Sequence, residues 1–328
     1  MDTSQSDALL QTLRDGLDLP EAGYSKSPVR LSGGYDTQIY EFQLSGVPER
    51  LSGLLVFRIF PQRNDQHRAL SEAAIQNTLV STGLLVPKVH FTGSESSGDF
   101  QPFLVMDHLE GDTLLQLTEP ESSLLLGKTH AELHQHPISP VIAGLNNRGV
   151  QSVLLADLLD RLTGAAQGFS WANVVVTWLV QHAPRESSRS ICHGDFHKLN
   201  VLQKAGAVTG ILDWSNFCVA EAAFDVANTI ISFSILAKHL TAQGDFEVVD
   251  LDQVLAQYHK AYETERELDD TNLTYYLVLR STMILFLAAL GMAKPYRHPM
   301  VVVDLCQLIE RHSGIQISPA VIQVQDNL

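Results

Sequence analysis

The spacing of apolar residues changes along the chain, and this change predicts a small sheet-rich part followed by a larger helical part. Residues 5 to 18 repeat leucine at helical spacing and predict a short amphipathic helix. Residues 66 to 82 predict a second helix, which Gly83 ends. The remaining runs in this part are rich in β-branched and aromatic residues and are bounded by turn residues. They predict strands at SPVRLSG, TQIYEFQL, LLVFRIF, PKVHFTG and PFLVMDHL.

From Gly111 onward the pattern favours helices, with one short interruption. Helical spacing is expected at residues 121 to 136, at 152 to 182 and from 224 to the end, with a β island at 191 to 213. We therefore expect an α+β fold of two lobes, a small antiparallel-sheet lobe and a larger, mainly helical one. The boundary is predicted between residues 1–109 and 110–328, with the connection near 107 to 111.

Composition and charge narrow the class of partner. Hydrophobic residues make up 45% of the chain and charged residues 18%, which is typical of a globular protein. The 22 basic and 37 acidic residues give a net charge of −15. A general nucleic-acid binder needs a cationic surface, so no nucleic-acid partner is expected. The same charge favours a cationic small molecule over an anionic one.

Three further observations bear on location. The N-terminus lacks the basic and apolar segments of a secretory signal. The longest apolar run, residues 283 to 293, is too short to cross a bilayer. The three cysteines show no paired spacing, so neither a disulfide framework nor a zinc–cysteine site is expected. We expect a cytoplasmic protein with no membrane partner; the sequence carries no signal for oligomeric state.

The β island holds an unusual concentration of polar residues. The stretch ICHGDFHKLNVL places Asp195 and Asn200 between apolar flanks, and Asp213 follows thirteen residues later at the end of VTGILDW. One carboxylate can orient a hydroxyl group and accept its proton. An asparagine oxygen and a second carboxylate are hard ligands that can hold Mg²⁺ against nucleotide phosphates. The spacing therefore favours phosphoryl transfer.

These motifs resemble the aminoglycoside phosphotransferase and choline kinase-like family, distant relatives of protein kinases. The resemblance lies in HGDFHKLN at 193 to 200, ILDW at 211 to 214 and FDVA at 224 to 227. It implies a bilobal protein-kinase-like fold and ATP- or GTP-dependent transfer, with Mg²⁺, to a hydroxyl of a small molecule. By this resemblance Asp195 is the catalytic base, and Asn200 and Asp213 are the metal ligands. Asp225 would brace the catalytic loop.

The first lobe carries weaker matches to the same family. Gly33 and Gly34 in LSGGYDTQIYEFQL resemble the hairpin that covers the nucleotide, although the pair lacks a GxGxxG pattern and by itself is typical of a common β-turn. Arg58 in LLVFRIF resembles the basic residue that contacts the α- and β-phosphates, and Glu72 resembles its partner. An edge-strand surface arginine and an exposed helix glutamate are the alternatives.

The stretch FLVMDHLEGDTL resembles the family hinge between the lobes. The resemblance implies that backbone groups from Asp107 to Leu109 meet the adenine and that Met106 lines its pocket. It also makes residues 1–109 the nucleotide-binding lobe and residues 110–328 the catalytic and acceptor-binding lobe.

Two other functions remain open. Imidazole and carboxylate at alternate positions of one strand, His193, Asp195 and His197, could bind Zn²⁺ in a hydrolase, although such a site needs further ligands from other elements. A nucleotide-binding protein without catalysis, a pseudokinase, is the second alternative. In the phosphotransferase interpretation His193 packs the catalytic loop as a core histidine, and His197 lies near the phosphates.

The acceptor is not identified by the sequence. An acidic stretch at residues 263 to 270 could face a cationic substrate, or it could be a solvated helix end. The very apolar segment at residues 275 to 290 is expected to be a core helix. Aminoglycosides, macrolides, choline-like amines, sugars and amino alcohols are all candidates, because one scaffold hosts many acceptors.

Overall fold

The chain folds into two compact units. The computed structural model describes residues 1–31, 37–93, 101–185, 188–239, 250–292 and 294–322. Unit 1 comprises Met1–Gly111, Pro140–Val150 and Leu202–Ser215, and unit 2 comprises Asp112–Ser139, Gln151–Val201 and Asn216–Leu328. Unit 1 thus also contains two segments that follow residue 109, whereas every segment of unit 2 lies after it. The predicted lobe boundary stays a prediction.

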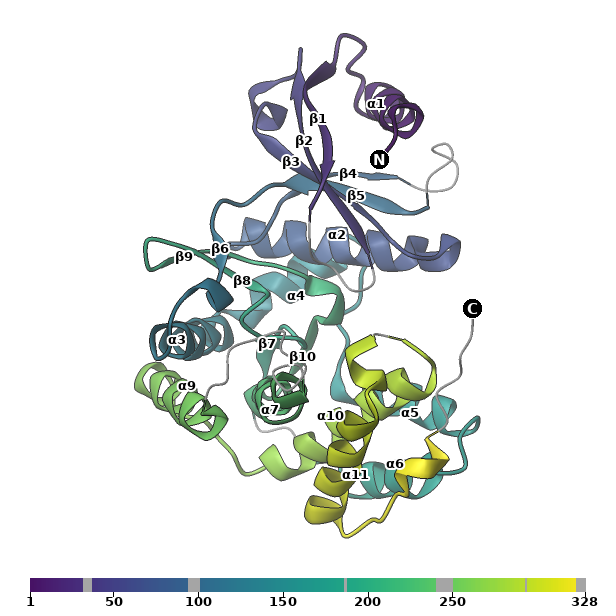
Figure 1. Cartoon of the computed structure of the whole chain (residues 1–328), viewed down its shortest axis with the longest axis vertical. Helices are drawn as coiled ribbons and strands as arrows, with labels where there is room; N and C mark the ends of the chain where they lie inside the picture. Colours follow the sequence, from purple (N-terminus) through teal and green to yellow (C-terminus); the bar gives the residue numbers. More distant parts are fainter. Residues whose placement is uncertain (32–36, 94–100, 186–187, 240–249, 293, 323–328) are drawn as a thin grey trace. The chain divides into compact units, whose positions relative to one another are not determined.

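Unit 1 is built on a five-stranded antiparallel sheet in the order β1-β2-β3-β5-β4. Pro28 lies in the edge strand β1, where its missing N–H costs no ladder bond, and the register shifts between Lys26 and Val29. Two helices, α1 and α2, flank the sheet (Figure 1). The elements are α1 (Thr3–Leu17), β1 (Gly23–Arg30), β2 (Gln38–Ser45), β3 (Leu54–Ile59), α2 (Gln66–Ser81), β4 (Val89–Gly93) and β5 (Phe103–Asp107).

The period-two alternation of strand side chains divides this sheet into two apolar faces. One face packs on α1 and contains Leu55, Phe57, Phe103 and Val105 from β3 and β5. The other packs on α2 and contains Val56, Phe60, Leu104 and Met106. Arg58 lies two residues after Val56 in β3, so its side chain falls on the face that α2 covers.

Two further segments complete unit 1. Most of α4 (Ile138–Asn147) belongs to unit 1. Arg148, the first residue after this helix, donates from Nε to Thr78 Oγ1 of α2 at 3.1 Å. The hairpin of β8 (Val201–Lys204) and β9 (Ala207–Ile211) is tied to the rest by Ile211 N–H, which donates to Leu85 O at 2.8 Å. Asp213, which follows this hairpin, therefore belongs to unit 1.

Unit 2 is mainly helical. Its core is formed by side chains from α5, α6, α7, α10 and α11, and α3 lies beside α9 (Figure 1). The short strands β7 and β10 pair antiparallel with Cys192 opposite Cys218. The elements are β6 (Asp112–Thr113), α3 (Glu121–Gln135), α5 (Leu155–Ala166), α6 (Ala172–Gln181), β7 (Ser190–Cys192), β10 (Cys218–Ala220), α7 (Ala222–Ile231), α9 (Leu251–Glu265), α10 (Leu273–Ala289) and α11 (Pro299–Ser313).

The fold class expected from the sequence is confirmed, with local differences. The apolar segment at 275 to 290 is a buried core helix, α10, as predicted. No helix in the described ranges combines the length and apolarity needed to cross a membrane. The first strand begins earlier than expected, at Gly23, and α4 and β10 were not predicted. β10 has only three residues, too few to display a period.

Two helical glycines in unit 2 give a test of this packing. A Cβ on Gly127 of α3 would lie 2.2 Å from Tyr258 O in α9, whereas a Cβ on Gly164 of α5 would meet nothing within 4 Å. Gly127→Ala should therefore lower the free energy of unfolding by about 1–3 kcal/mol through overpacking. Gly164→Ala should leave it unchanged or raise it by up to about 1 kcal/mol.

Urea unfolding followed by circular dichroism measures both changes. Equal effects of the two substitutions would contradict the close approach of α3 and α9.

Candidate functional site

The sequence HGDFHKLN forms the loop after β7, and a carboxylate from α7 holds its first residues. Asp225 Oδ2 accepts the amide N–H of His193 at 2.6 Å, and Oδ1 accepts that of Gly194 at 2.8 Å. Asp225 is fully buried, and a buried carboxylate needs such donors to stay charged. The expectation that Asp225 braces this loop is confirmed, and His193 is buried in the core as expected.

Gly194 is the one loop position that only glycine can fill. Its φ is 78°, in the left-handed region, and a Cβ there would lie 2.2 Å from Asn216 O. Its carbonyl oxygen accepts from Arg280 Nη2 of α10 at 2.9 Å. The peptide groups around Gly194 are therefore held by α7 on the N–H side and by α10 on the C=O side.

Asp195, His197 and Asn200 lie together on this loop. Asn200 Nδ2 donates to the backbone oxygen of Asp195 at 2.9 Å, and His197 Nε2 lies 3.5 Å from Asp195 Oδ2. The side chains of Asp195 and His197 are about three-quarters buried, with 24% and 25% of their surface exposed. A carboxylate, an imidazole and an amide are thus presented together with access to solvent.

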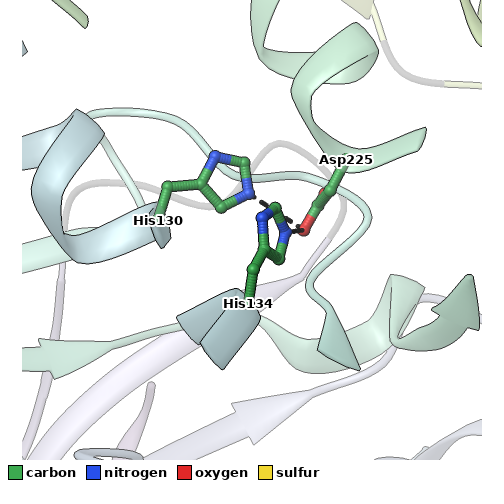
Figure 2. Close-up of side chains that lie close together, drawn as sticks. All are labelled: His130, His134 and Asp225. Atoms are coloured by element: carbon green, nitrogen blue, oxygen red, sulfur yellow. Dashed lines mark hydrogen bonds and ion pairs between the residues drawn. The ribbon is translucent and has the colours of Figure 1, made fainter. Parts of the chain in front are cut away.

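Behind the loop, two histidines of α3 face Asp225 (Figure 2). His130 Nε2 and His134 Nε2 lie 3.1 and 3.4 Å from Asp225 Oδ2, and all three side chains are fully buried. Burial, with His130 as the second cause, lowers the pKa of His134 to about 3, and burial likewise lowers the pKa of His130. Burial acts to raise the pKa of Asp225, but the two histidines outweigh it and hold that pKa well below its ordinary value.

The same cluster could in principle hold a metal ion, since its ligand atoms all lie within 4.8 Å of one another. Its hydrogen bonds favour another interpretation. The hydroxyls of Tyr258 and Tyr262 lie 2.7 Å from Nδ1 of His130 and His134, so neutral rings can accept there. This leaves Nε2–H of His134 to donate to the Asp225 carboxylate at 3.4 Å. We interpret the cluster as a brace for the loop.

In unit 1, Arg58 and Glu72 form a buried ion pair. Arg58 Nη1 lies 2.5 Å from Glu72 Oε1, and the residues are 5% and 1% exposed. The expected pairing is therefore present. β3 is an inner strand of the sheet, so the alternatives of an edge-strand surface arginine and an exposed helix glutamate are wrong. Arg58 Nη2 also donates to Asp213 Oδ1 at 3.2 Å.

The charges in this trio shift one another. Burial acts to lower the pKa of Arg58, but Glu72 and Asp213 outweigh it and raise that pKa. Burial and, more weakly, Asp213 raise the pKa of Glu72, while Arg58 opposes both. Arg58 therefore stays charged and pairs with two carboxylates. Removal of either carboxylate would leave the buried guanidinium less well compensated and would destabilise the fold.

The backbone of Asp213 is in the left-handed region, at a φ of 59°. Aspartate and asparagine adopt this conformation more readily than most residues. Its Oδ1 also accepts from Ser215 Oγ at 2.8 Å, and the next side chain, Trp214, anchors the turn by donating from Nε1 to Ile211 O at 2.9 Å. The turn thus fixes the direction of the Asp213 carboxylate.

The predicted adenine contacts lie at the end of β5 in unit 1. Met106 is buried on the α2 face, and Asp107 Oδ1 lies 2.6 Å from His90 Nε2. Leu109 is half-buried. Gly33 and Gly34 lie outside the described residues. A role of these positions in nucleotide binding stays a prediction.

The acidic stretch at 263 to 270 includes the end of α9 and the segment that follows it. Residues of this segment line a pocket of about 530 Å³ in unit 2, together with Glu221. Arg266 also lines this pocket, so its lining is of mixed charge. Its role in binding an acceptor stays a prediction.

The sequence did not reveal four side chains that hold the loop: His130, His134, Asn228 and Arg280. The two histidines are spaced i, i+4, which places them on one face of α3, but this spacing says nothing of Asp225 nearly a hundred residues later. Arg280 did carry a signal. It is a single charge inside the otherwise apolar α10, and such a residue is seldom buried without a partner.

A family model described as "Phosphotransferase enzyme family" matches residues 28–269. The acyl-CoA dehydrogenase family member 11 of Pongo abelii is 25% identical over 178 residues, 49% of this chain. The chain spans about a fifth, 22%, of the length of that relative.

Two solved structures are similar over nearly the whole chain. Macrolide 2′-phosphotransferase type I is 14% identical with a TM-score of 0.57, over 97% of this chain and 99% of that one. A thermostable mutant of aminoglycoside phosphotransferase APH(4)-Ia, in a ternary complex with ADP and hygromycin B, is 14% identical with a TM-score of 0.59, over 98% and 100%. These likenesses confirm the expected protein-kinase-like fold.

The buried histidines predict how stability depends on pH. In the unfolded chain histidine takes up a proton below a pH of about 6.5, whereas folded His134 stays neutral down to about 3. Between these two values the unfolded state binds more protons than the folded state. For this residue the free energy of unfolding therefore decreases by about 1.4 kcal/mol for each unit by which the pH is lowered. His134→Gln should remove roughly 2 kcal/mol of the loss between pH 6.5 and 4.5.

Urea unfolding at several pH values measures this slope. Tyr262→Phe, which removes the hydroxyl beside His134 Nδ1, is the control: it should lower stability but keep the slope. An unchanged slope in His134→Gln would contradict the assignment.

Proposed function

The chain belongs to the phosphotransferase enzyme family, and from this premise we propose that it transfers the γ-phosphate of ATP to a hydroxyl of a small molecule. The observation that carries the proposal is the loop 193 to 200, whose Asp195 and Asn200 are held beside each other and braced from behind by Asp225. The ADP in the APH(4)-Ia complex supports a nucleotide as the donor.

We assign Asp195 as the general base. Its carboxylate is partly exposed and can accept the proton of an acceptor hydroxyl while the hydroxyl oxygen attacks the γ-phosphorus. A new O–P bond forms, the bond from the γ-phosphorus to the β,γ-bridging oxygen breaks, and ADP leaves. His197, 3.5 Å from Asp195 Oδ2, is assigned to the phosphate side of this reaction.

We assign Asn200 and Asp213 as ligands of Mg²⁺. The side-chain N–H of Asn200 is used by the Asp195 carbonyl, which leaves Oδ1 as the atom that can bind a cation. Asp213 adds a carboxylate fixed by Ser215 and by its own turn. Bound magnesium would offset charge on the terminal phosphates during transfer, and two protein ligands suffice for it.

Arg58 is assigned to the non-transferred phosphates. A guanidinium that stays charged when buried suits this role, and Glu72 holds it on the α2 face of the sheet. Gly33 and Gly34 would cover the phosphates, and Met106 with the backbone from Asp107 to Leu109 would hold the adenine. Whether the donor is GTP rather than ATP is tested by competition between the two nucleotides for binding.

The acceptor is proposed to be a small hydroxylated molecule, with a cationic one favoured by the net charge of −15. We propose a cytoplasmic location and neither a nucleic-acid nor a membrane partner. Consumption of ATP against a library of hydroxylated antibiotics, amines and sugars tests the function. Binding of ATP with no transfer to any member would favour the pseudokinase alternative.

Replacing the proposed base gives the first kinetic prediction. Asp195→Asn should leave ATP binding nearly intact, while turnover falls at least a hundredfold, in line with general-base contributions of roughly 10²–10⁴. Asp160→Asn, an exposed carboxylate on α5, is the matched control and should keep full turnover. Full activity in Asp195→Asn would refute the assigned role.

The proposed metal ligand is tested by removing its charge without disturbing its turn. Asp213→Asn keeps a residue that accepts a φ of 59° but loses the carboxylate. We expect the Mg²⁺ concentration for half-maximal turnover to rise about tenfold or more, and thermal stability to fall because Arg58 loses one of its two carboxylate partners. Titration of Mg²⁺ at saturating ATP measures this, and an unchanged midpoint would count against Asp213 as a ligand.

A further inference from the structure

A buried cation in the core of unit 2 connects to the proposed base. Arg280 lies in the middle of the apolar helix α10 and is 8% exposed, with its guanidinium carbon 5.0 Å from the ring centre of Phe224. Burying a cation is costly unless hydrogen bonds compensate. Arg280 Nη2 donates to two neutral oxygens, Gly194 O at 2.9 Å and Asn228 Oδ1 at 2.6 Å.

Both of these oxygens lead to Asp195. The carbonyl of Gly194 belongs to the peptide group that ends at the nitrogen of Asp195. Asn228 of α7 has its Nδ2 3.5 Å from Asp195 Oδ1. Because a guanidinium only donates, it fixes which end of the Asn228 amide faces it. The amide oxygen must face Arg280, and the NH₂ group therefore faces the Asp195 carboxylate.

We propose that Arg280 and Asn228 are positioning residues that set the direction of the Asp195 carboxylate. Arg280 holds the peptide before Asp195, and Asn228, oriented by Arg280, directs an N–H at the carboxylate. This inference rests on the proposed function, in which Asp195 is the general base. A small displacement of a catalytic group costs up to about 10²-fold in rate, so such support is expected to affect turnover.

The experiment uses the full chain and MgATP, with phosphate release to water as the probe. Asn228→Leu, which keeps the approximate shape, and Arg280→Met should each lower kcat about tenfold or more, while the KM for MgATP stays within about twofold. In an Asp195→Asn background neither substitution should lower kcat further. A role in packing alone would give the same fractional loss in both backgrounds.

Thr282→Val provides the matched control. Thr282 is a buried polar residue of the same helix, and its hydroxyl donates only to its own helix at Val278 O among the bonds described. It should lose stability without losing kcat. Wild-type kcat in both Asn228→Leu and Arg280→Met, or equal losses with and without Asp195, would overturn the proposal. Should Arg280→Met fail to fold, Asn228→Leu alone decides.

A measurement without turnover separates this inference from the proposed function. A crystal structure of the wild type should show the Asp195 side chain in one rotamer. A crystal structure of Asn228→Leu should show it in several. If the wild type forms no ADP from ATP with any acceptor, the proposed function fails, while the rotamer comparison still decides on positioning. An unchanged single rotamer in Asn228→Leu would overturn the inference even in an active enzyme.

Discussion

The structure of the loop 193 to 200 depends on one buried carboxylate. Asp225 receives the N–H groups of His193 and Gly194, and two neutral histidines face the same group from α3. A charge in the interior is stable only with donors on every side. The need to satisfy Asp225 therefore fixes how the loop, α3 and α7 pack together. Asp195 directly follows the two residues that Asp225 holds, so its backbone position is fixed as well.

Unit 1 contains a buried cation, Arg58, that likewise needs compensating groups. Strand alternation places Arg58 on the α2 face of the sheet among apolar side chains, where it would be unstable alone. Glu72, on the covering helix, and Asp213, at the end of the β9 hairpin, supply the compensating charge. In this phosphotransferase the polar residues of each unit are thus fixed by the cost of burying them.

The sequence predicted most of the fold and the loop but not its supports. The long helices α2 and α10 were found within a few residues, because an apolar run and a terminating glycine are local properties of the chain. The Arg58–Glu72 pair was predicted through family resemblance and is present. The contacts of His130, His134 and Asn228 were missed because they join helices that are far apart in sequence. Short or irregular elements such as β10 and α4 gave no readable period.

The backbone of Asp213 has a consequence for how this fold diverges. Aspartate and asparagine share a tolerance for its left-handed φ of 59°, so a single-base change in the codon can erase the carboxylate and leave the hairpin intact. Gly194 offers no such route, because any side chain there would collide with Asn216 O. Related proteins that keep this fold but have lost catalysis are therefore expected to have replaced Asp213 and to have retained Gly194.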